Sequence, residues 1–248
     1  MTQQNFVIGD VHGCYTKLKK LLNYWNPDSE QLIFIGDLID RGEQSRDVVQ
    51  LAMKLKEEYG AIVIGGNHED LFLDWLDAPL QQMSFYYMVG GEQTLTSFYN
   101  QELVQTLSPE KLAERMQQDF HKEIEFLRSL PDYVEQGEYL YVHAGVDLTL
   151  ADWKNSGKLF FRSIREPFHN GTNHTGKTIV FGHTPTRRLH KDKRDDIWTS
   201  HCQTKIGIDG AAVFGGKLHG LRIKGNGDFD LFSIDSENDV TTKSFEFK

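Results

Sequence analysis

The sequence has few cysteines, no long apolar run and a deficit of positive charge, and each shortage excludes a class of protein. Its two cysteines, Cys14 and Cys202, could form one disulfide, but such usage fits a reducing cytosol better. Residues 1–5 are polar, and the apolar run behind them is only Phe6–Ile8. We therefore expect no signal peptide and no membrane span, which needs roughly 20 apolar residues. These observations predict a cytoplasmic protein without a membrane partner.

Positive charge is outnumbered, because 27 Lys and Arg residues stand against 36 Asp and Glu residues and the formal net charge is −9. Non-specific binding to nucleic acid depends on neutralising phosphates with Lys and Arg, so we expect no nucleic-acid partner. A local basic pocket remains compatible with this balance. With 248 residues, 39% of them hydrophobic, the chain can bury a sizeable core.

Three apolar segments, 5–9, 32–35 and 61–64, alternate with two segments of helical periodicity. In the helical segments the apolar positions recur every three or four residues, as on one face of an amphipathic helix. Each apolar segment is followed at once by glycine and polar residues. This order is typical of βαβ units with parallel strands.

The chain from about residue 70 to residue 130 changes in composition. It is rich in Gln, Glu and aromatic residues and contains no clear strand, and Ser108–Pro109 is a typical helix start. We predict one domain over residues 1–248 with a helical insertion at about 70–130. We expect the aromatic stripe of this insertion to form core packing, while the insertion as a whole is a candidate lid over a pocket.

Apolar strands return at 139–142 and 177–181. The charged segment 187–196 carries both signs, and we expect a solvated loop there. From residue 205 onward, alternating segments separated by Gly and Asn turns predict antiparallel strands at 216–224, 229–234 and 240–247.

Polar residues follow all five apolar strands at the point where each strand ends. In open α/β sheets, ligands bind outside the carboxyl ends of the strands, so we expect these side chains to meet. A single His after a strand is usually a structural residue, and a single Asp beside Gly is usually a turn residue. Recurrence at five strand ends favours a functional site made of Asp10, His12, Asp37, Asn67, His68, His143 and His183.

The chemistry of this set indicates metal ions. It offers oxygens and imidazoles but no thiol, a mixture that suits Mn²⁺, Fe or Zn²⁺ better than an all-oxygen Mg²⁺ or Ca²⁺ site. Seven ligands exceed what one tetrahedral ion uses, so two ions that share a carboxylate explain the set most simply. Two ions roughly 3.5–4 Å apart can clamp a phosphoryl group and generate hydroxide for in-line attack.

The same segments resemble a known motif series. In chain order, the sequence contains Gly-Asp-Val-His-Gly at 9–13, Gly-Asp-Leu-Ile-Asp-Arg-Gly at 36–42, Gly-Asn-His-Glu at 66–69, His-Ala-Gly at 143–145 and Gly-His-Thr-Pro at 182–185. In content and order these segments resemble the motifs of the phosphoprotein phosphatase family of calcineurin-like metallophosphoesterases. Segments 208–211 and 215–218 resemble the tail of the bacterial and phage branch. That branch includes lambda-type protein phosphatases and symmetrical diadenosine tetraphosphatases.

The resemblance implies a fold and a set of roles. The fold would be a mixed α/β αββα sandwich of two sheets with an inserted helical lobe. Two divalent ions, Mn²⁺ in the first place and Fe or Zn²⁺ as alternatives, would share Asp37. One ion would add Asp10 and His12, and the other would add Asn67, His143 and His183.

The resemblance also implies that His68 protonates the leaving oxygen while Asp40 orients its imidazole. Independently, imidazole titrates near neutral pH, which suits a general acid. Arg41 would bind the phosphate, together with Asn67 and His68. The family has a second phosphate-binding arginine in a Trp-Ile-Arg-Glu context, and here Ser-Ile-Arg-Glu at 163–166 selects Arg165, with Arg162 as the alternative.

The substrate is left open between two classes. Asp40 and the Gly-Asn-His-Glu segment favour a phosphatase acting on phosphoserine or phosphothreonine in proteins, and on small phosphoesters. The related tetraphosphatases resemble Gly-Asp-Leu-Val-Ala-Arg-Gly at the second motif, but the short acidic chain and the tail segments keep a symmetrical diadenosine tetraphosphate hydrolase as the alternative. A non-catalytic pseudophosphatase that binds a partner would be expected to lack a ligand or His68, and none is missing. Cys14 is expected to be structural.

Overall fold

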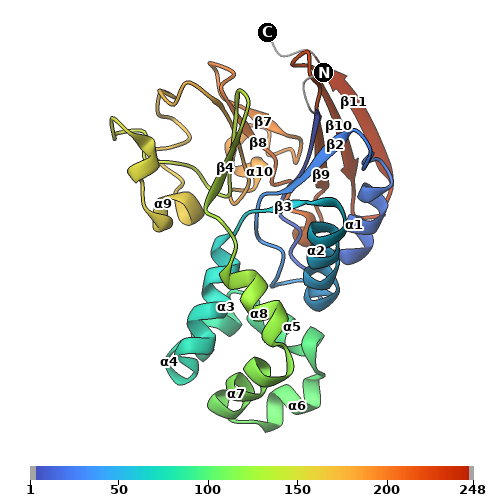
Figure 1. The fold of residues 1–248 in the computed structure, drawn as a ribbon, viewed down its shortest axis with the longest axis vertical. Helices are drawn as coiled ribbons and strands as arrows, with labels where there is room; N and C mark the ends of the chain where they lie inside the picture. The colour runs from blue at the N-terminus through green and yellow to red at the C-terminus, as the bar shows by residue number, and fades with distance from the viewer. Residues whose placement is uncertain (1–3, 246–248) are drawn as a thin grey trace.

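The computed structural model describes residues 4–245, which form two mixed β-sheets with ten helices around and below them (Figure 1). The first sheet has the strand order β11-β10-β9-β1-β2-β3, and the second has the order β4-β5-β6-β8-β7. The mixed α/β fold with two sheets is therefore confirmed. The strands are β1 (Gln4–Ile8), β2 (Glu30–Phe34), β3 (Ile62–Val63), β4 (Tyr133–Gln136), β5 (Tyr139–Val142), β6 (Thr178–Phe181), β7 (Trp198–Thr199), β8 (Lys205–Gly207), β9 (Leu218–Ile223), β10 (Phe229–Ile234) and β11 (Val240–Phe245).

The first sheet combines the two arrangements that the sequence predicts. Strand β1 pairs in parallel with β2, and β2 pairs in parallel with β3. The C-terminal strands β9, β10 and β11 are antiparallel, and β9 joins them to β1. The predicted strand 240–247 extends at its end to residues that lie outside the described part of the chain.

The second sheet departs from the prediction in its centre. Strand β8 lies in the region where we expected antiparallel pairing, yet it pairs in parallel with β6, which also pairs in parallel with β5. That expectation is wrong for the pairing of β8 with β6, because the long connection over residues 182–204 returns the chain to the same end of the sheet, and it holds for the pairing of β8 with β7. Strands β4 and β7, which the sequence pattern did not predict, close the two edges with antiparallel pairs.

Alternating side chains of β1 hold the layers together. Val7 packs between the two sheets with Ile33, Val180 and Ile206, whereas Phe6 and Ile8 point to the opposite face. That outer face is covered by α1 (Tyr15–Leu22) and α2 (Ser45–Tyr59), in contact with the apolar faces of both helices. The two sheets thus share one buried layer, and their strand ends are held in fixed positions.

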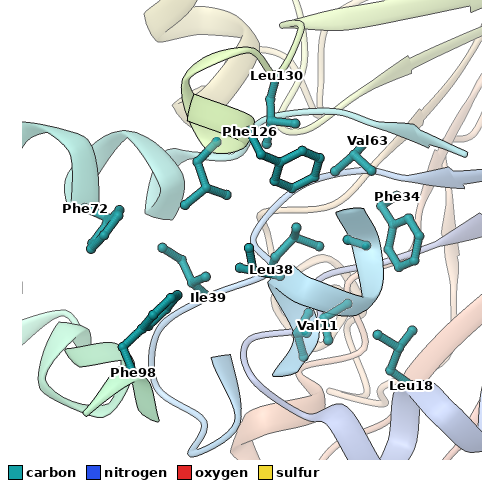
Figure 2. Packing of buried hydrophobic residues seen from close by; sticks show 14 of the residues in the cluster. Val11, Leu18, Phe34, Leu38, Ile39, Val63, Phe72, Phe98, Phe126 and Leu130 are labelled. Atoms are coloured by element: carbon teal, nitrogen blue, oxygen red, sulfur yellow. The ribbon is translucent and has the colours of Figure 1, made fainter. Parts of the chain in front are cut away.

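The chain between β3 and β4 is helical throughout. Figure 1 shows its helices below the sheets, and Figure 2 shows Phe72 and Phe98 packed near Ile39, and Phe126 near Val63. The insertion therefore shares the core of the first sheet. Its helices are α3 (Asn67–Asp77), α4 (Pro79–Met88), α5 (Gly91–Phe98), α6 (Gln101–Thr106), α7 (Pro109–Asp119) and α8 (His121–Arg128).

The helix start at Ser108–Pro109 is confirmed, because the Ser108 hydroxyl accepts a hydrogen bond from the Lys111 backbone N–H at 3.4 Å and Pro109 is the first residue of α7. The two helices of the second half are α9 (Lys158–Ser163) and α10 (Thr186–Leu189). The expectation of a loop over 187–196 is therefore wrong at its start, where α10 continues into it. None of the helices in the described residues has the length and apolar content needed to cross a membrane.

Candidate metal centre and active site

The loops that follow five strands meet at one edge of the two sheets. All six predicted metal ligands lie in these loops: Asp10 and His12 after β1, Asp37 after β2, Asn67 after β3, His143 after β5 and His183 after β6. Five of them are buried, with at most 8% of the side chain exposed, and Asn67 is half-buried. The fold therefore brings together residues that are up to 173 positions apart in the sequence.

Several of these residues have an unusual backbone conformation. His12, Asp37 and His183 have φ angles of 45°, 50° and 61°, in the left-handed region that costs a non-glycine residue of order 1–3 kcal/mol. The tight turns bring the loops into close contact, since a Cβ atom on Gly66 would collide with the Asp37 carboxylate. Such costs are typical of backbone that is constrained by a functional site.

The two oxygens of Asp37 face two different histidines. Oδ2 lies 3.4 Å from Nε2 of His12, and Oδ1 lies 3.3 Å from Nε2 of His143. In each histidine the other nitrogen, Nδ1, is within hydrogen-bond distance of a backbone carbonyl, that of Ile39 at 2.7 Å and that of Ile35 at 2.8 Å. Carbonyl oxygens only accept, so each Nδ1 carries hydrogen and each Nε2 is directed at Asp37. This is the arrangement by which proteins orient metal-binding histidines.

Asn67 connects His143 to the last predicted ligand. Its Oδ1 lies 3.1 Å from Nε2 of His143 and 2.7 Å from Nδ1 of His183. Nε2 of His183 is buried and has no hydrogen-bond partner among the described residues. Two groups of ligand atoms lie within 4.8 Å of one another, namely His12 with Asp37 and His68, and Asp37 with His143 and His183. Asp37 belongs to both groups, so its carboxylate is placed to be shared by two cations, while His68, the predicted acid, lies beside the first of them.

The electrostatics of the cluster are dominated by the Asp37 carboxylate and the imidazoles around it. Burial lowers the pKa of His143, but the carboxylates of Asp37 and Asp10 outweigh it and raise this pKa to about 9. Burial likewise raises the pKa of Asp37, but the three surrounding imidazoles hold it well below its usual value. His183 lies at the other extreme, since burial and the nearby His143 lower its pKa to about 2. Asp37 thus offers an ionised carboxylate and His183 a neutral imidazole, the forms in which these groups bind metals, whereas His143 would release a proton on binding one.

Asp10 lies next to the cluster but outside the two groups of mutually close donors. Its carboxylate accepts the backbone N–H of His183 at 2.9 Å. Burial and the neighbouring Asp209 raise its pKa well above the usual value. Asp209, in the tail segment, is itself 5% exposed, and burial raises its pKa to about 6. The sequence pattern pointed to the tail segment but not to Asp209 as a neighbour of Asp10. The role of Asp10 as a metal ligand stays a prediction.

Glu69 is a buried acidic residue that the sequence interpretation did not assign. Its carboxylate accepts the backbone N–H groups of Asp37 at 3.0 Å, Leu38 at 2.8 Å and Gly66 at 2.7 Å. Glu69 therefore joins the second and third motif loops and fixes the backbone of Asp37. Its position three residues after Gly66, at the start of α3, was the only signal in the sequence.

His68 and Asp40 form a buried pair at the same centre. Nδ1 of His68 lies 2.7 Å from Oδ2 of Asp40, and the backbone N–H of His68 donates to Oδ1 of Asp37 at 3.0 Å. Asp40 is completely buried and also receives hydrogen bonds from Tyr86 at 2.8 Å and Thr94 at 2.7 Å. The aromatic stripe of the insertion was expected to form core packing only, which is wrong for the hydroxyl group of Tyr86.

Arg41 reaches the metal centre from the end of the second motif. Its Nη1 lies 2.5 Å from Nε2 of His12, and its guanidinium stacks 5.2 Å from the ring centroid of Phe214. The backbone N–H of Arg41 donates to the carbonyl of Gly90 at 2.8 Å. A planar guanidinium in this place can bind a phosphoryl group in a bidentate manner.

The two candidates for the second arginine have different environments. Arg162 is 4% exposed, and its guanidinium donates to Asp132 at 2.9 Å, to the carbonyl of Leu130 at 3.0 Å and to Asp70. These three hydrogen bonds, one from each guanidinium nitrogen, connect the end of the insertion to α9. Arg165 is exposed, and burial of part of its side chain, with the positive charges of Arg188 and Arg41, lowers its pKa. Arg165 is thus accessible to a ligand near the centre, while the guanidinium of Arg162 is buried among its partners.

Neither cysteine takes part in this site. Both are unpaired, and burial raises the pKa of the half-buried Cys14 thiol, which disfavours the thiolate form that a nucleophile needs. The arrangement is therefore a buried oxygen and imidazole cluster at strand ends, flanked by arginines and a His–Asp pair. This combination defines the class of metal-dependent phosphoesterases.

The chain belongs to the calcineurin-like phosphoesterase family, whose model matches residues 6–217. It is accordingly a phosphoric ester hydrolase with a site that can bind divalent metal ions. Among curated proteins it is 28% identical to the asymmetrical bis(5'-nucleosyl)-tetraphosphatase PrpE of Anoxybacillus flavithermus, over 87% of this chain and 89% of that protein. It is 29% identical to serine/threonine-protein phosphatase 1 of Salmonella typhimurium, over 88% and 91%.

Solved structures confirm the fold. A structure described as a putative diadenosine tetraphosphatase matches 100% of this chain and 96% of its own, with a TM-score of 0.65 and 19% identity. A serine/threonine phosphatase from Saccharomyces cerevisiae matches 99% of this chain and 80% of its own, with a TM-score of 0.54 and 17% identity. At these identities the likeness concerns the fold alone.

Proposed function

We propose that this enzyme hydrolyses phosphomonoesters, in the first place phosphoserine and phosphothreonine in proteins, with two divalent ions. The observation that carries the proposal is the pair of His68 and Asp40 beside Asp37, with 2.7 Å between Nδ1 and Oδ2. We propose Mn²⁺ as the bound ion, with Fe or Zn²⁺ as alternatives, because the donors are carboxylate, amide and imidazole.

The His–Asp pair favours a monoester because of the leaving group. A serine or threonine alkoxide is a strong base and leaves only when it receives a proton, so a positioned acid contributes typically 10²–10⁴-fold to the rate. The nucleotide that leaves from an internal phosphoanhydride is already stable as an anion. A proton donor with a completely buried carboxylate partner is therefore most useful for a phosphomonoester.

The residues of the chain divide the work. Bound ions would supply charge neutralisation of the phosphoryl group and activation of water. Arg41 and Arg165, together with Asn67 and His68, would hold and orient the phosphate. Asp40 keeps hydrogen on Nδ1 of His68, so Nε2 of the same ring is the atom that would give its proton to the leaving oxygen.

A second candidate function is hydrolysis of a dinucleoside tetraphosphate. It is supported by the relatives named as asymmetrical tetraphosphatases and by an open hollow of about 370 Å³ beside Arg165, lined by Leu159, Phe160 and Ile164. The mode of cleavage separates two versions of it. Symmetrical cleavage would release two ADP molecules, whereas asymmetrical cleavage would release ATP and AMP.

A rate comparison tests the two functions. With Mn²⁺ present, kcat/KM is measured for a phosphothreonine peptide and for diadenosine tetraphosphate, and the nucleotide products are identified. The proposal requires the peptide to be the better substrate. A higher kcat/KM for diadenosine tetraphosphate would overturn it, and the products would then show which cleavage occurs.

The unpaired Cys14 and Cys202 support our further proposal that the protein is cytoplasmic.

A further inference from the structure

The carboxylate of Asp40 receives hydrogen bonds from the helical insertion. Oδ1 accepts the hydroxyl of Tyr86 at 2.8 Å and the hydroxyl of Thr94 at 2.7 Å, while Oδ2 lies 2.7 Å from Nδ1 of His68. Tyr86 belongs to α4 and Thr94 to α5, and both are at most 1% exposed. The insertion therefore contributes hydroxyl groups to a buried pair that comes from the sheet loops.

These contacts determine what the carboxylate can do. Two hydroxyl donors occupy the accepting positions of Oδ1, so Oδ2 is left for His68. A carboxylate fixed by two further partners holds the imidazole in one orientation, with Nδ1 as the donor. Burial, followed by the charge of Asp40, raises the pKa of Tyr86 well above its usual value, so its hydroxyl stays protonated and can only donate to the carboxylate.

The tyrosine ring is itself fixed by packing. It stacks on Trp75 with 5.7 Å between ring centroids and an interplanar angle of 21°, and Trp75 belongs to α3, which also carries His68. A Cβ atom on Gly91 would collide with the Tyr86 ring. The hydroxyl of Tyr86 thus has one available position, and that position is at Asp40.

The backbone of the second motif is held by the same part of the insertion. The N–H of Asp40 donates to the Thr94 hydroxyl at 2.8 Å, and the N–H of Arg41 donates to the Gly90 carbonyl at 2.8 Å. Both residues have left-handed φ angles, 70° for Asp40 and 71° for Arg41, so the loop needs partners to hold this shape. The turn between α4 and α5 supplies them.

We propose that Tyr86 and Thr94 are positioning residues, through which the helical insertion holds Asp40 and thereby aligns His68 to protonate the leaving group. This inference rests on the proposed function of His68 as the proton donor. It gives the insertion a direct part in catalysis, in addition to any part it has in covering the substrate.

The dependence of the rate on the leaving group tests this proposal. Tyr86→Phe removes the hydroxyl and keeps the ring in its stack. We expect kcat for phenyl phosphate, whose leaving phenol has a pKa of about 10 like that of tyrosine, to fall about tenfold. For 2,4-dinitrophenyl phosphate, whose leaving group needs no proton, we expect a fall of less than about twofold. Equal losses on both substrates, or no loss on either, would overturn the proposal.

Thr94 provides a second test in case Tyr86→Phe does not fold. Thr94→Val removes the hydroxyl at similar volume and should give the same dependence on the leaving group, and Thr94→Ser, which retains a hydroxyl, should restore the rate on phenyl phosphate. Tyr99→Phe is the matched control, because Tyr99 also donates to a carboxylate of the insertion, that of Asp119 at 3.1 Å, in an exposed hydrogen bond that does not involve Asp40. It should leave both rates unchanged.

A double-mutant cycle shows whether Tyr86 acts through His68. In a His68→Asn background, Tyr86→Phe should cause no further loss on phenyl phosphate, because the group it positions is gone. A further loss of about tenfold, as in the wild-type background, would assign Tyr86 a role that does not depend on His68 and would overturn the proposal.

A measurement without turnover separates this proposal from the proposed function. In protein labelled with ¹⁵N-histidine and loaded with diamagnetic Zn²⁺, the Nδ1–H signal of His68 is identified by its loss in His68→Asn. We expect Tyr86→Phe to shift or broaden this signal and Tyr99→Phe to leave it unchanged. If the wild type hydrolyses neither a phosphothreonine peptide nor an aryl phosphate, the proposed function is wrong, and this signal alone decides whether Tyr86 positions the pair. An unchanged signal in Tyr86→Phe would overturn the positioning role.

Discussion

Oδ1 of Asp37 lies 3.3 Å from Nε2 of His143, and the other oxygen of the same carboxylate faces His12. The contact joins a loop of the first sheet to a loop of the second. The Nδ1–H group of each histidine donates a hydrogen bond to a backbone carbonyl. Neither ring can therefore turn away from Asp37 without losing a buried hydrogen bond. Asp37 is therefore the residue through which the two halves of the metal centre are coupled.

Replacement of Asp37 by Asn should weaken both metal sites together. The substitution keeps the size of the side chain but removes the negative charge that two cations would share. We expect the metal content after gel filtration, measured by mass spectrometry, to fall from two ions per chain to less than one. Asp192→Asn, on the exposed loop, is the control and should retain both ions. Two ions at full occupancy in Asp37→Asn would contradict the bridging role.

Replacement of His68 by Asn should reduce turnover and leave the metal content intact. We expect kcat for a phosphothreonine peptide to fall by roughly 10²–10³-fold, because the proton donor is lost while the residues around the ions remain. Metal content and the thermal midpoint measured in parallel separate this result from loss of structure. Near-normal turnover would remove His68 as the acid.

Much of this site could be predicted from the sequence, because each apolar strand ends in polar residues and parallel strand ends share an edge. Asp37 and His143 were found in this way although they lie 106 positions apart in the sequence. Glu69 and Tyr86 were not, because their role depends on which carboxylate or N–H faces them in three dimensions. Periodicity assigns a residue to a buried face, but it does not show that one hydroxyl on that face meets a charged partner.

The pairing of β8 and the choice between the two arginines illustrate the same limit. Strand β8 has three residues, too few for a pattern that distinguishes a parallel from an antiparallel neighbour. Arg162 and Arg165 lie three positions apart, and the resemblance selects Arg165 but leaves Arg162 as an alternative. Only the positions of Asp70 and Asp132 show that one of them is already paired.

Removal of metal should abolish activity reversibly. After treatment with a chelator and desalting, we expect hydrolysis of 4-nitrophenyl phosphate to fall to background and to return when Mn²⁺ is added, since the proposed mechanism relies on the ions to activate water and to neutralise the phosphoryl group. Addition of Fe²⁺ or Zn²⁺ in parallel ranks the alternatives. Activity that survives chelation at its initial rate would contradict a metal-dependent mechanism.

Acid should destabilise the fold through a histidine that lies outside the metal centre. His219 is completely buried between Ser233 and the Asp195 carbonyl, and burial lowers its pKa to about 4. The unfolded chain, with a histidine pKa of about 6.5, binds the proton first as pH falls, so stability is complete above pH 6.5 and decreases between about 6.5 and 4. The decrease is on the order of 3 kcal/mol.

His219→Gln should therefore reduce the loss of stability between pH 7.5 and pH 5, even if it lowers stability at pH 7.5. Urea unfolding of the metal-free proteins at the two pH values measures this difference. His174→Gln, at an exposed position, is the control and should keep the pH dependence of the wild type. An unchanged pH dependence in His219→Gln would assign the acid sensitivity to other groups.

Arg162 and Arg165 should differ in what their loss affects. Arg162→Ala leaves the carboxylates of Asp70 and Asp132 without their buried partner, so we expect a loss of stability on the order of 3–5 kcal/mol, measured by urea unfolding. Arg165→Ala removes an exposed side chain and should leave the unfolding midpoint unchanged, while kcat/KM for the phosphothreonine peptide falls about 10–100-fold through the lost charged hydrogen bonds to phosphate. Each variant is the other's control. An unchanged kcat/KM in Arg165→Ala would show that Arg165 does not bind the phosphate.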